Sequence, residues 1–159
     1  AMPSDARFED GAERPVFVTA MDEEGLAVIS ALVQDAVFPV REMRWHRRRR
    51  RFGVLLNRFR WEDRARAEAS GRPYERVRAV LAVDDVTAVR SQGVDRSEPD
   101  TVLSLLALSW EPGQDAAGRL VLTLAGDGAI ALEAECLDVT LRDVTRPYPA
   151  PSGRAPRHD

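Results

Sequence analysis

Lysine is absent from this 159-residue chain, and all 23 basic side chains are arginine. A coding bias towards GC-rich codons is the simplest cause, so a run of arginines carries less functional information here than in most proteins. Cysteine occurs only once, at Cys136, which excludes a disulfide within the chain. This cysteine usage is consistent with a reducing compartment.

Histidine is almost as rare, with only His46 and His158. One cysteine and two histidines so widely spaced do not form a recognisable zinc site. The sequence also lacks the Gly-Lys-Ser/Thr of a phosphate loop, a Gly-x-Ser-x-Gly motif and a His-Glu-x-x-His motif. We therefore predict no catalytic residue, no metal ligand and no cofactor, and regard an enzyme of unknown type as only the third choice.

Long apolar runs are missing as well. None approaches the roughly 18 residues that a membrane-spanning helix needs, and no secretory signal is visible. We expect a cytoplasmic protein that does not contact a membrane. The length favours one domain. Composition divides the chain into a flexible N-terminal arm at 1–14, a single globular domain at 15–145 and a Pro-rich C-terminal tail at 146–159.

Charge is distributed unevenly. Residues 1–40 contain two arginines against eight acidic residues, a net charge of −6. Residues 41–78 contain fourteen arginines against five acidic residues, or +9, and residues 79–159 return to −6. The basic middle can create a local positive field, or it can be neutralised by the acidic ends in the folded chain.

The most distinctive stretch is a predicted β-hairpin at 36–61 with a basic turn. Apolar residues alternate with polar ones on both sides of five consecutive arginines, as in half-buried strands. If His46 lies opposite Arg51, then Trp45 faces Phe52 and Met43 faces Val54. The hairpin tip is a candidate anion-binding or nucleic-acid-binding site, and the alternative is a solvated structural turn. Its arginines are Arg47, Arg48, Arg49, Arg50 and Arg51.

Three tryptophans end predicted strands in similar contexts, at Trp45, Trp61 and Trp110. They are candidates for an aromatic ligand cleft. The alternative is that they close the end of a β-structure.

A single helix is predicted near the N-terminus, over residues 23–34. Asp22 is its N-cap candidate, Glu23 and Glu24 lie in its first turn, and apolar residues follow at helical spacing. Short alternating segments fill most of the rest, with a tight turn at Gly126-Asp127-Gly128. The predicted fold is α+β, a mainly antiparallel, strongly curled sheet or partial barrel of seven to eight strands with one N-terminal helix.

Two segments of the sequence are compatible with more than one secondary structure. The segment EDRARAEASGRP after Trp61 suits a short exposed helix or a long loop. Beyond Cys136 the alternation changes phase, which indicates a bulge in one long strand, with a helix over 137–144 as the alternative. Cys136 itself lies in an apolar alternation, and we expect a buried, unreactive thiol.

The acidic residues of the second half are explained by turn chemistry, although a divalent cation or an acid/base pair is the alternative. These residues are Asp84, Asp85, Asp95, Glu98 and Asp100.

Five segments in this order resemble an uncharacterised alphaproteobacterial family that is classed only as a domain of unknown function. They are DEEGLAVISALVQDAV, RFGVLLNRFRWE, ERVRAVLAVDDV, DTVLSLLALSWEP and GAIALEAECLDVTLRDV, within residues 16–145. The resemblance implies no activity, cofactor or catalytic residue. It also implies that WHRRRRRF is a variable basic turn.

Taken together, these patterns favour a non-enzymatic binding or protein-interaction module. An unknown protein partner or a homodimer fits this interpretation, and we expect no specific binding of nucleic acid because the sequence pI is near 5.5. An anion- or nucleic-acid-binding domain that uses the basic hairpin is the alternative.

Overall fold

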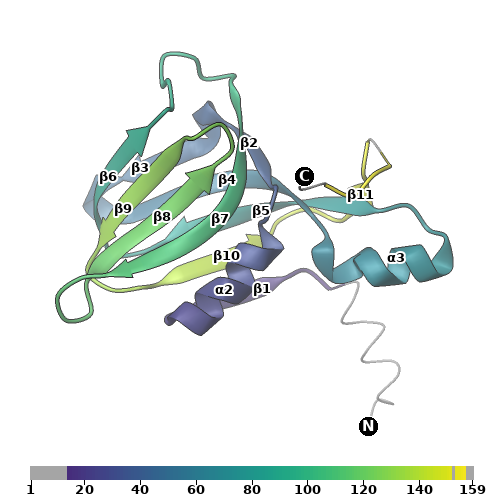
Figure 1. The fold of residues 1–159 in the computed structure, drawn as a ribbon, viewed down its shortest axis with the longest axis horizontal. Coiled ribbons are helices and arrows are strands. Elements are labelled where there is room, and N and C mark those ends of the chain that lie inside the picture. Colours follow the sequence, from purple (N-terminus) through teal and green to yellow (C-terminus); the bar gives the residue numbers. More distant parts are fainter. Residues whose placement is uncertain (1–13, 152, 157–159) are drawn as a thin grey trace, which may run out of the picture.

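A computed structural model describes residues 14–151 and 153–156. Within these residues the chain forms an 11-stranded antiparallel sheet in the order β1-β10-β5-β4-β2-β7-β8-β9-β6, with β3 paired to β4 and β11 paired to β5 (Figure 1). Two α-helices and three short 3₁₀ turns accompany the strands. The strands are β1 Phe17–Ala20, β2 Val37–Pro39, β3 Met43–His46, β4 Arg51–Phe59, β5 Glu75–Val83, β6 Val86–Gln92, β7 Val102–Pro112, β8 Gly118–Leu124, β9 Ala129–Ala134, β10 Val139–Asp143 and β11 Tyr148–Pro149. The helices are α2 Glu23–Leu32 and α3 Arg64–Ser70, and the 3₁₀ turns are η1 Val40–Glu42, η2 Arg47–Arg49 and η3 Trp61–Asp63.

The predicted fold class is therefore wrong. The sheet has 11 strands, not seven to eight, and it is neither closed nor strongly curled, since the described residues show no pairing between its end strands β1 and β6. A second α-helix, α3, occupies the segment that the sequence left open between a helix and a loop. The strand count was too low partly because β2 and β11 are only 3 and 2 residues long, too short to show an alternating pattern.

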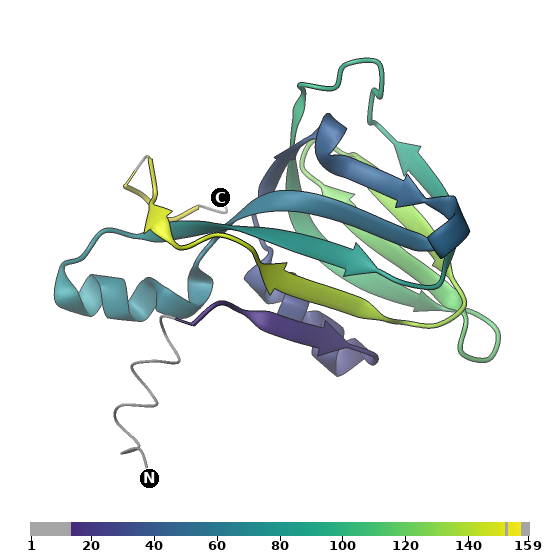
Figure 2. The ribbon, with the colours of Figure 1, turned by 180° about the vertical axis from the view of Figure 1, so that it is seen from behind.

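Two groups of strands face each other across the core. In Figure 1 the strands β6, β9, β8 and β7 lie in front of β3, β4, β5 and β10, and Figure 2 shows the second group from its own side. The short strand β2 joins the groups, because it pairs with β4 on one side and β7 on the other. One apolar cluster fills the space between them and includes Leu56, Leu81, Leu122 and Leu132.

Helix α2 forms for the reasons that the sequence indicates. The Asp22 carboxylate accepts a hydrogen bond from the Gly25 N–H at 2.7 Å and caps the first turn. Leu26 and Ile29 bury the apolar face of the helix. The expectation of the longest helix at 23–34 is confirmed, with α2 ending at Leu32.

The strand register around the arginine run is confirmed. Met43 pairs with Val54, Trp45 with Phe52 and His46 with Arg51, as the alternation predicts. Arg50 completes the turn in the left-handed region with a φ of 53°.

The segment after β9 differs from the favoured expectation of one bulged strand. Strand β9 ends at Ala134, the chain bends, and β10 begins at Val139 as the partner of β1 and β5. The helix considered for 137–144 does not form. The change of phase marks a transfer of the chain from one group of strands to the other.

The ends of the chain are described in part. Residues 1–13, most of the predicted N-terminal arm, and His158 lie outside the described residues. In the predicted tail, β11 pairs with β5 through Tyr148 opposite Arg76, and the Ala150 N–H donates to the Tyr74 carbonyl at 2.8 Å. None of the described helices has the length and apolar character needed to cross a membrane.

Candidate functional site

Charged side chains are buried where β4 ends. Arg58 is fully buried, and the side chains of Arg60 and Asp63 are each only 4 % exposed. Arg58 follows Phe52, Val54 and Leu56 in the same strand phase, so the alternation that turns these apolar residues inward also turns Arg58 inward. Burying a cation costs free energy unless carboxylates surround it, so a buried Arg58 requires acidic partners.

Two carboxylates hold the Arg58 guanidinium in paired hydrogen bonds. Asp143 at the end of β10 accepts from Nε at 3.0 Å and from Nη2 at 2.9 Å. Glu62 in η3 accepts from Nη1 at 2.9 Å and from Nη2 at 2.8 Å. Burial by itself lowers the pKa of Arg58, but the hydrogen bonds to Glu62 and Asp143 outweigh it and raise that pKa overall. Asp143 also accepts the Val16 N–H at 2.9 Å, which ties the start of β1 to the same cluster.

A second group of ion pairs connects the two ends of α3. Gly71 ends this helix in the left-handed region with a φ of 63°, so the chain reverses and Arg72 reaches back to Asp63 with bonds of 2.7 and 2.8 Å. Arg60 donates to Glu75 at 2.5 Å and lies 3.7 Å from Asp63. The hydrogen bond from Arg72 is the main reason why the pKa of Asp63 is lowered.

These ion pairs form one wall of a pocket with a volume of about 520 Å³, which we call the arginine pocket. Figures 1 and 2 show α3 and β11 together at one end of the molecule, the end at which this pocket lies. Its lining comes from the segment just before β1, the region from β4 to β5 and the segment after β10. The lining residues are Pro15, Arg60, Asp63, Arg66, Arg72, Glu75, Thr145, Arg146 and Pro147.

Four arginines face two carboxylates in this lining, so positive charge is in excess. Arg66 and Arg146 are exposed, and neither forms an ion pair with any residue that the structure describes. The Thr145 hydroxyl accepts the Arg78 N–H at 3.0 Å, which leaves its own proton available as a donor. Guanidinium groups and a hydroxyl arranged in this way suit an oxyanion such as a phosphate or a carboxylate.

The arginines at 47–51 are held in two different ways. Arg50 pairs with Glu135, and Arg51 pairs with Asp84 at 2.8 Å. Arg47, Arg48 and Arg49 form η2, are exposed, and have no ion-pair partner in the described part of the chain. The tip therefore presents three unpaired guanidinium groups to solvent.

The three tryptophans lie in different surroundings. Trp45 is half-buried opposite Phe52, whereas Trp110 on β7 packs against Gly118 on β8. The Trp61 indole N–H donates to the Gln34 carbonyl at 2.9 Å, and the Trp61 ring contacts Phe59 edge-on at 4.6 Å. Within the described residues, Trp45 and Trp110 line two different pockets.

Cys136 is half-buried, in contrast to the buried thiol that we expected. It lies in the bend between β9 and β10, and its Sγ donates to the Asp85 carboxylate at 3.2 Å. That hydrogen bond, together with burial and nearby acidic residues, raises the pKa of Cys136 to about 11. The thiol is therefore protonated near neutral pH, which makes it a poor nucleophile.

The acidic residues of the second half have ordinary structural partners. Asp95 accepts the backbone N–H and the hydroxyl of Ser97 in a turn, and Asp100 pairs with Arg41 at 2.7 Å. In the residues that the structure describes, no group of three or more acidic, histidine or cysteine side chains is arranged to hold a metal ion.

Comparison with known proteins gives a family and nothing more specific. A family model described as "Protein of unknown function (DUF2948)" matches residues 17–158. No curated protein and no solved structure matches the chain.

Proposed function

This chain belongs to the DUF2948 family of proteins of unknown function, and we propose a function from the geometry of the arginine pocket. The protein is a non-enzymatic binding module that holds a small, multiply charged oxyanion in this pocket. The observation behind this proposal is the pair Arg66 and Arg146, which line the pocket without an ion-pair partner among the described residues. A phosphate or a di- or tricarboxylate would supply the missing negative charge.

The buried ion pairs support this role by making the pocket wall rigid. Asp63 fixes Arg72 and Glu75 fixes Arg60, so these two arginines are positioned before a ligand arrives. A site built in this way loses little side-chain entropy on binding.

Binding without catalysis fits the state of the pocket carboxylates. The pKa of Asp63 is lowered by its hydrogen bond from Arg72, so Asp63 stays ionised and is a weak proton acceptor. Glu75 is occupied by Arg60 and Arg72 at 2.5 and 3.3 Å. The pocket lining contains no histidine or cysteine.

Isothermal titration calorimetry at constant ionic strength tests the proposal with inorganic phosphate, citrate and, as a monovalent control, acetate. We expect phosphate or citrate to bind and acetate not to bind; the stronger of the first two identifies the oxyanion type. Arg66→Gln and Arg146→Gln should each weaken binding about tenfold, because each removes a charge-assisted contact. Arg142→Gln is the matched control, since Arg142 is exposed on β10 and does not line the pocket.

Absence of binding by both phosphate and citrate would overturn the proposal. An equal loss in Arg142→Gln would overturn it too, because the effect would then come from overall charge.

A protein-interaction role is the second candidate, and exposed apolar side chains at the edge strand β1 favour it. Phe17 is 67 % exposed and Met21, just after the strand, is 71 % exposed. An unpaired strand edge can add a strand from a partner or from a second copy of the chain. Analytical ultracentrifugation of the wild type and of Phe17→Ser tests self-association; a monomer at every concentration would count against a homodimer.

A third candidate is that the basic hairpin binds the phosphate backbone of a nucleic acid, and the exposed Arg47, Arg48 and Arg49, which have no ion-pair partner among the described residues, favour it.

We also propose a cytoplasmic location and an alphaproteobacterial origin. The resemblance of the five sequence segments supports the origin, and the single cysteine supports the location.

A further inference from the structure

A second pocket lies between the β3–β4 hairpin and β6. Figure 1 shows these strands at the opposite end of the molecule from α3. We call it the hairpin pocket, and its volume is about 210 Å³. Both groups of strands contribute to it, so it exists only because they face each other. Its lining residues are Val40, Met43, Arg44, Trp45, Phe52, Val89, Ser91, Arg96 and Ile130.

The inner surface of this pocket is apolar and well packed. Phe52 and Ile130 are 2 % and 1 % exposed and form its floor. Trp45 lies beside Phe52 as its strand partner, is half-buried against the core and lines the pocket. An apolar ligand group would gain burial here without displacing a polar group of the protein.

The polar groups of the pocket are at its mouth. Ser91 lies opposite Ile130 in the β6–β9 register, so the two side chains share the inward face of the sheet. Arg96 lies in the loop after β6 and forms no hydrogen bond or ion pair with any residue within 14–151 or 153–156. Arg44 also lines the pocket, but it alternates with Met43 and Trp45, and its side chain is on the opposite face of β3.

The size of the pocket limits the ligand to about one ring. A cavity of about 150 Å³ lined by apolar side chains is sufficient to bind benzene in another protein. The hairpin pocket exceeds this value by enough for a ring with a short substituent. A ligand with one anionic group would match the single guanidinium of Arg96.

We propose that the hairpin pocket binds a single-ring aromatic monocarboxylate, with the ring against Trp45 and Phe52 and the carboxylate bound by Arg96 and the Ser91 hydroxyl. This site differs from the arginine pocket in location and in chemistry. The arginine pocket is lined mainly by charged groups and suits a polar, multiply charged ligand, whereas the hairpin pocket requires an apolar body.

The test is an NMR titration with 3-phenylpropanoate and with its neutral amide as the matched ligand. The indole N–H signal of Trp45, assigned with Trp45→Phe, should move with the acid, while the signals of Trp61 and Trp110 stay in place. The acid should bind about tenfold more tightly than the amide, as one charge-assisted contact predicts. Arg96→Gln should remove this preference.

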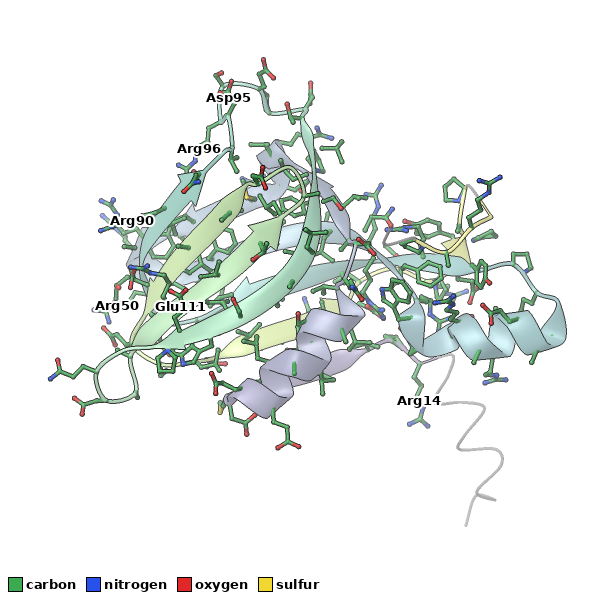
Figure 3. All side chains as sticks on the ribbon, viewed as in Figure 1. Arg14, Arg50, Arg90, Asp95, Arg96 and Glu111 are labelled. Atoms are coloured by element: carbon green, nitrogen blue, oxygen red, sulfur yellow. The ribbon has the colours of Figure 1, made fainter. Side chains whose placement is uncertain are left out.

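Arg90→Gln is the control variant. Arg90 lies on β6 close to the pocket, but it alternates with Val89 and Ser91 and points away from the sheet in Figure 3. It should leave both affinities unchanged. Equal binding of acid and amide, the same loss in Arg90→Gln as in Arg96→Gln, or an unmoved Trp45 signal would each overturn the proposal.

Discussion

The two ends of the molecule use opposite means to make a pocket. At the α3 end, buried guanidinium and carboxylate groups neutralise each other, and the pocket is lined by charge. At the hairpin end, apolar side chains from both groups of strands form the floor, and Arg96 and Ser91 lie at the mouth. The stability of a structure held by ion pairs should depend on pH, whereas the stability of one held by apolar burial should not.

The largest expected effect is at the α3 end. Arg58→Met should lower the free energy of unfolding by about 3–5 kcal/mol, because it leaves the buried Asp143 carboxylate and the neighbouring Glu62 without their cation. Urea denaturation followed by circular dichroism measures this loss. The neighbouring exposed change Arg142→Gln should stay within about 0.5 kcal/mol. A loss below about 1 kcal/mol for Arg58→Met would show that the ion pairs do not stabilise this end.

The pH dependence of stability separates the two ends. Burial raises the pKa of Glu62, but the hydrogen bond from Arg58 lowers it overall in the folded chain. Its stabilisation is therefore complete above the ordinary glutamate pKa and is lost as the pH falls below it. Glu62→Gln removes this titrating group. Between about pH 7 and pH 3 the free energy of unfolding of the variant should therefore fall by about 1 kcal/mol less than that of the wild type.

Phe52→Leu at the hairpin pocket is the comparison variant for this measurement. It should lower stability by a similar amount at every pH, since it changes apolar packing and not ionisation. Parallel pH profiles for the wild type and Glu62→Gln would contradict the assignment.

A smaller effect is expected at the bend between the two groups of strands, where Asp85 restrains Cys136. The hydrogen bond to Asp85 is the first reason that the pKa of this thiol is raised to about 11. Asp85→Asn should increase the rate of alkylation by iodoacetamide at pH 8 about tenfold, because more thiolate is present. Asn suits the φ of 58° at this position, so the backbone should be unaffected.

The labelling rate of the wild type should rise with pH up to about 11. Rapid labelling of the wild type at pH 7, or an unchanged rate in Asp85→Asn, would show that Asp85 does not control this thiol.

The smallest effect on stability is expected at the hairpin tip. Replacing Arg47, Arg48 and Arg49 with Ser should change the free energy of unfolding by less than about 0.5 kcal/mol, since these side chains are exposed and unpaired in the described structure. Any binding of single-stranded DNA or RNA should fall with salt, with a log–log slope of about −0.7 per phosphate contact. We expect no specific binding; binding that is lost in the triple variant would establish the tip as a phosphate site.

The buried ion pairs around Arg58 could be predicted only in part from the sequence. Phe52, Val54 and Leu56 alternate in one phase, and continuing that phase places Arg58 inside. Residue type argues against that continuation, because apolar side chains are normally buried and a fully buried arginine is rare. The structure buries both Arg58 and the next residue, Phe59. The partners that make Arg58 tolerable could not be inferred, since Asp143 lies 85 residues away.

The sequence by itself determined the local elements of this protein. The Asp22 cap began α2, alternation set the pairing of Trp45 with Phe52, and Gly126 and Asp127 made the turn between β8 and β9. These features depend on residues close in the chain, whose periodicity and turn preferences act locally. Only the tertiary structure decided which strands face each other, which carboxylates meet Arg58 and how both pockets are assembled, because these contacts join distant segments and depend on the order of strands in the sheet.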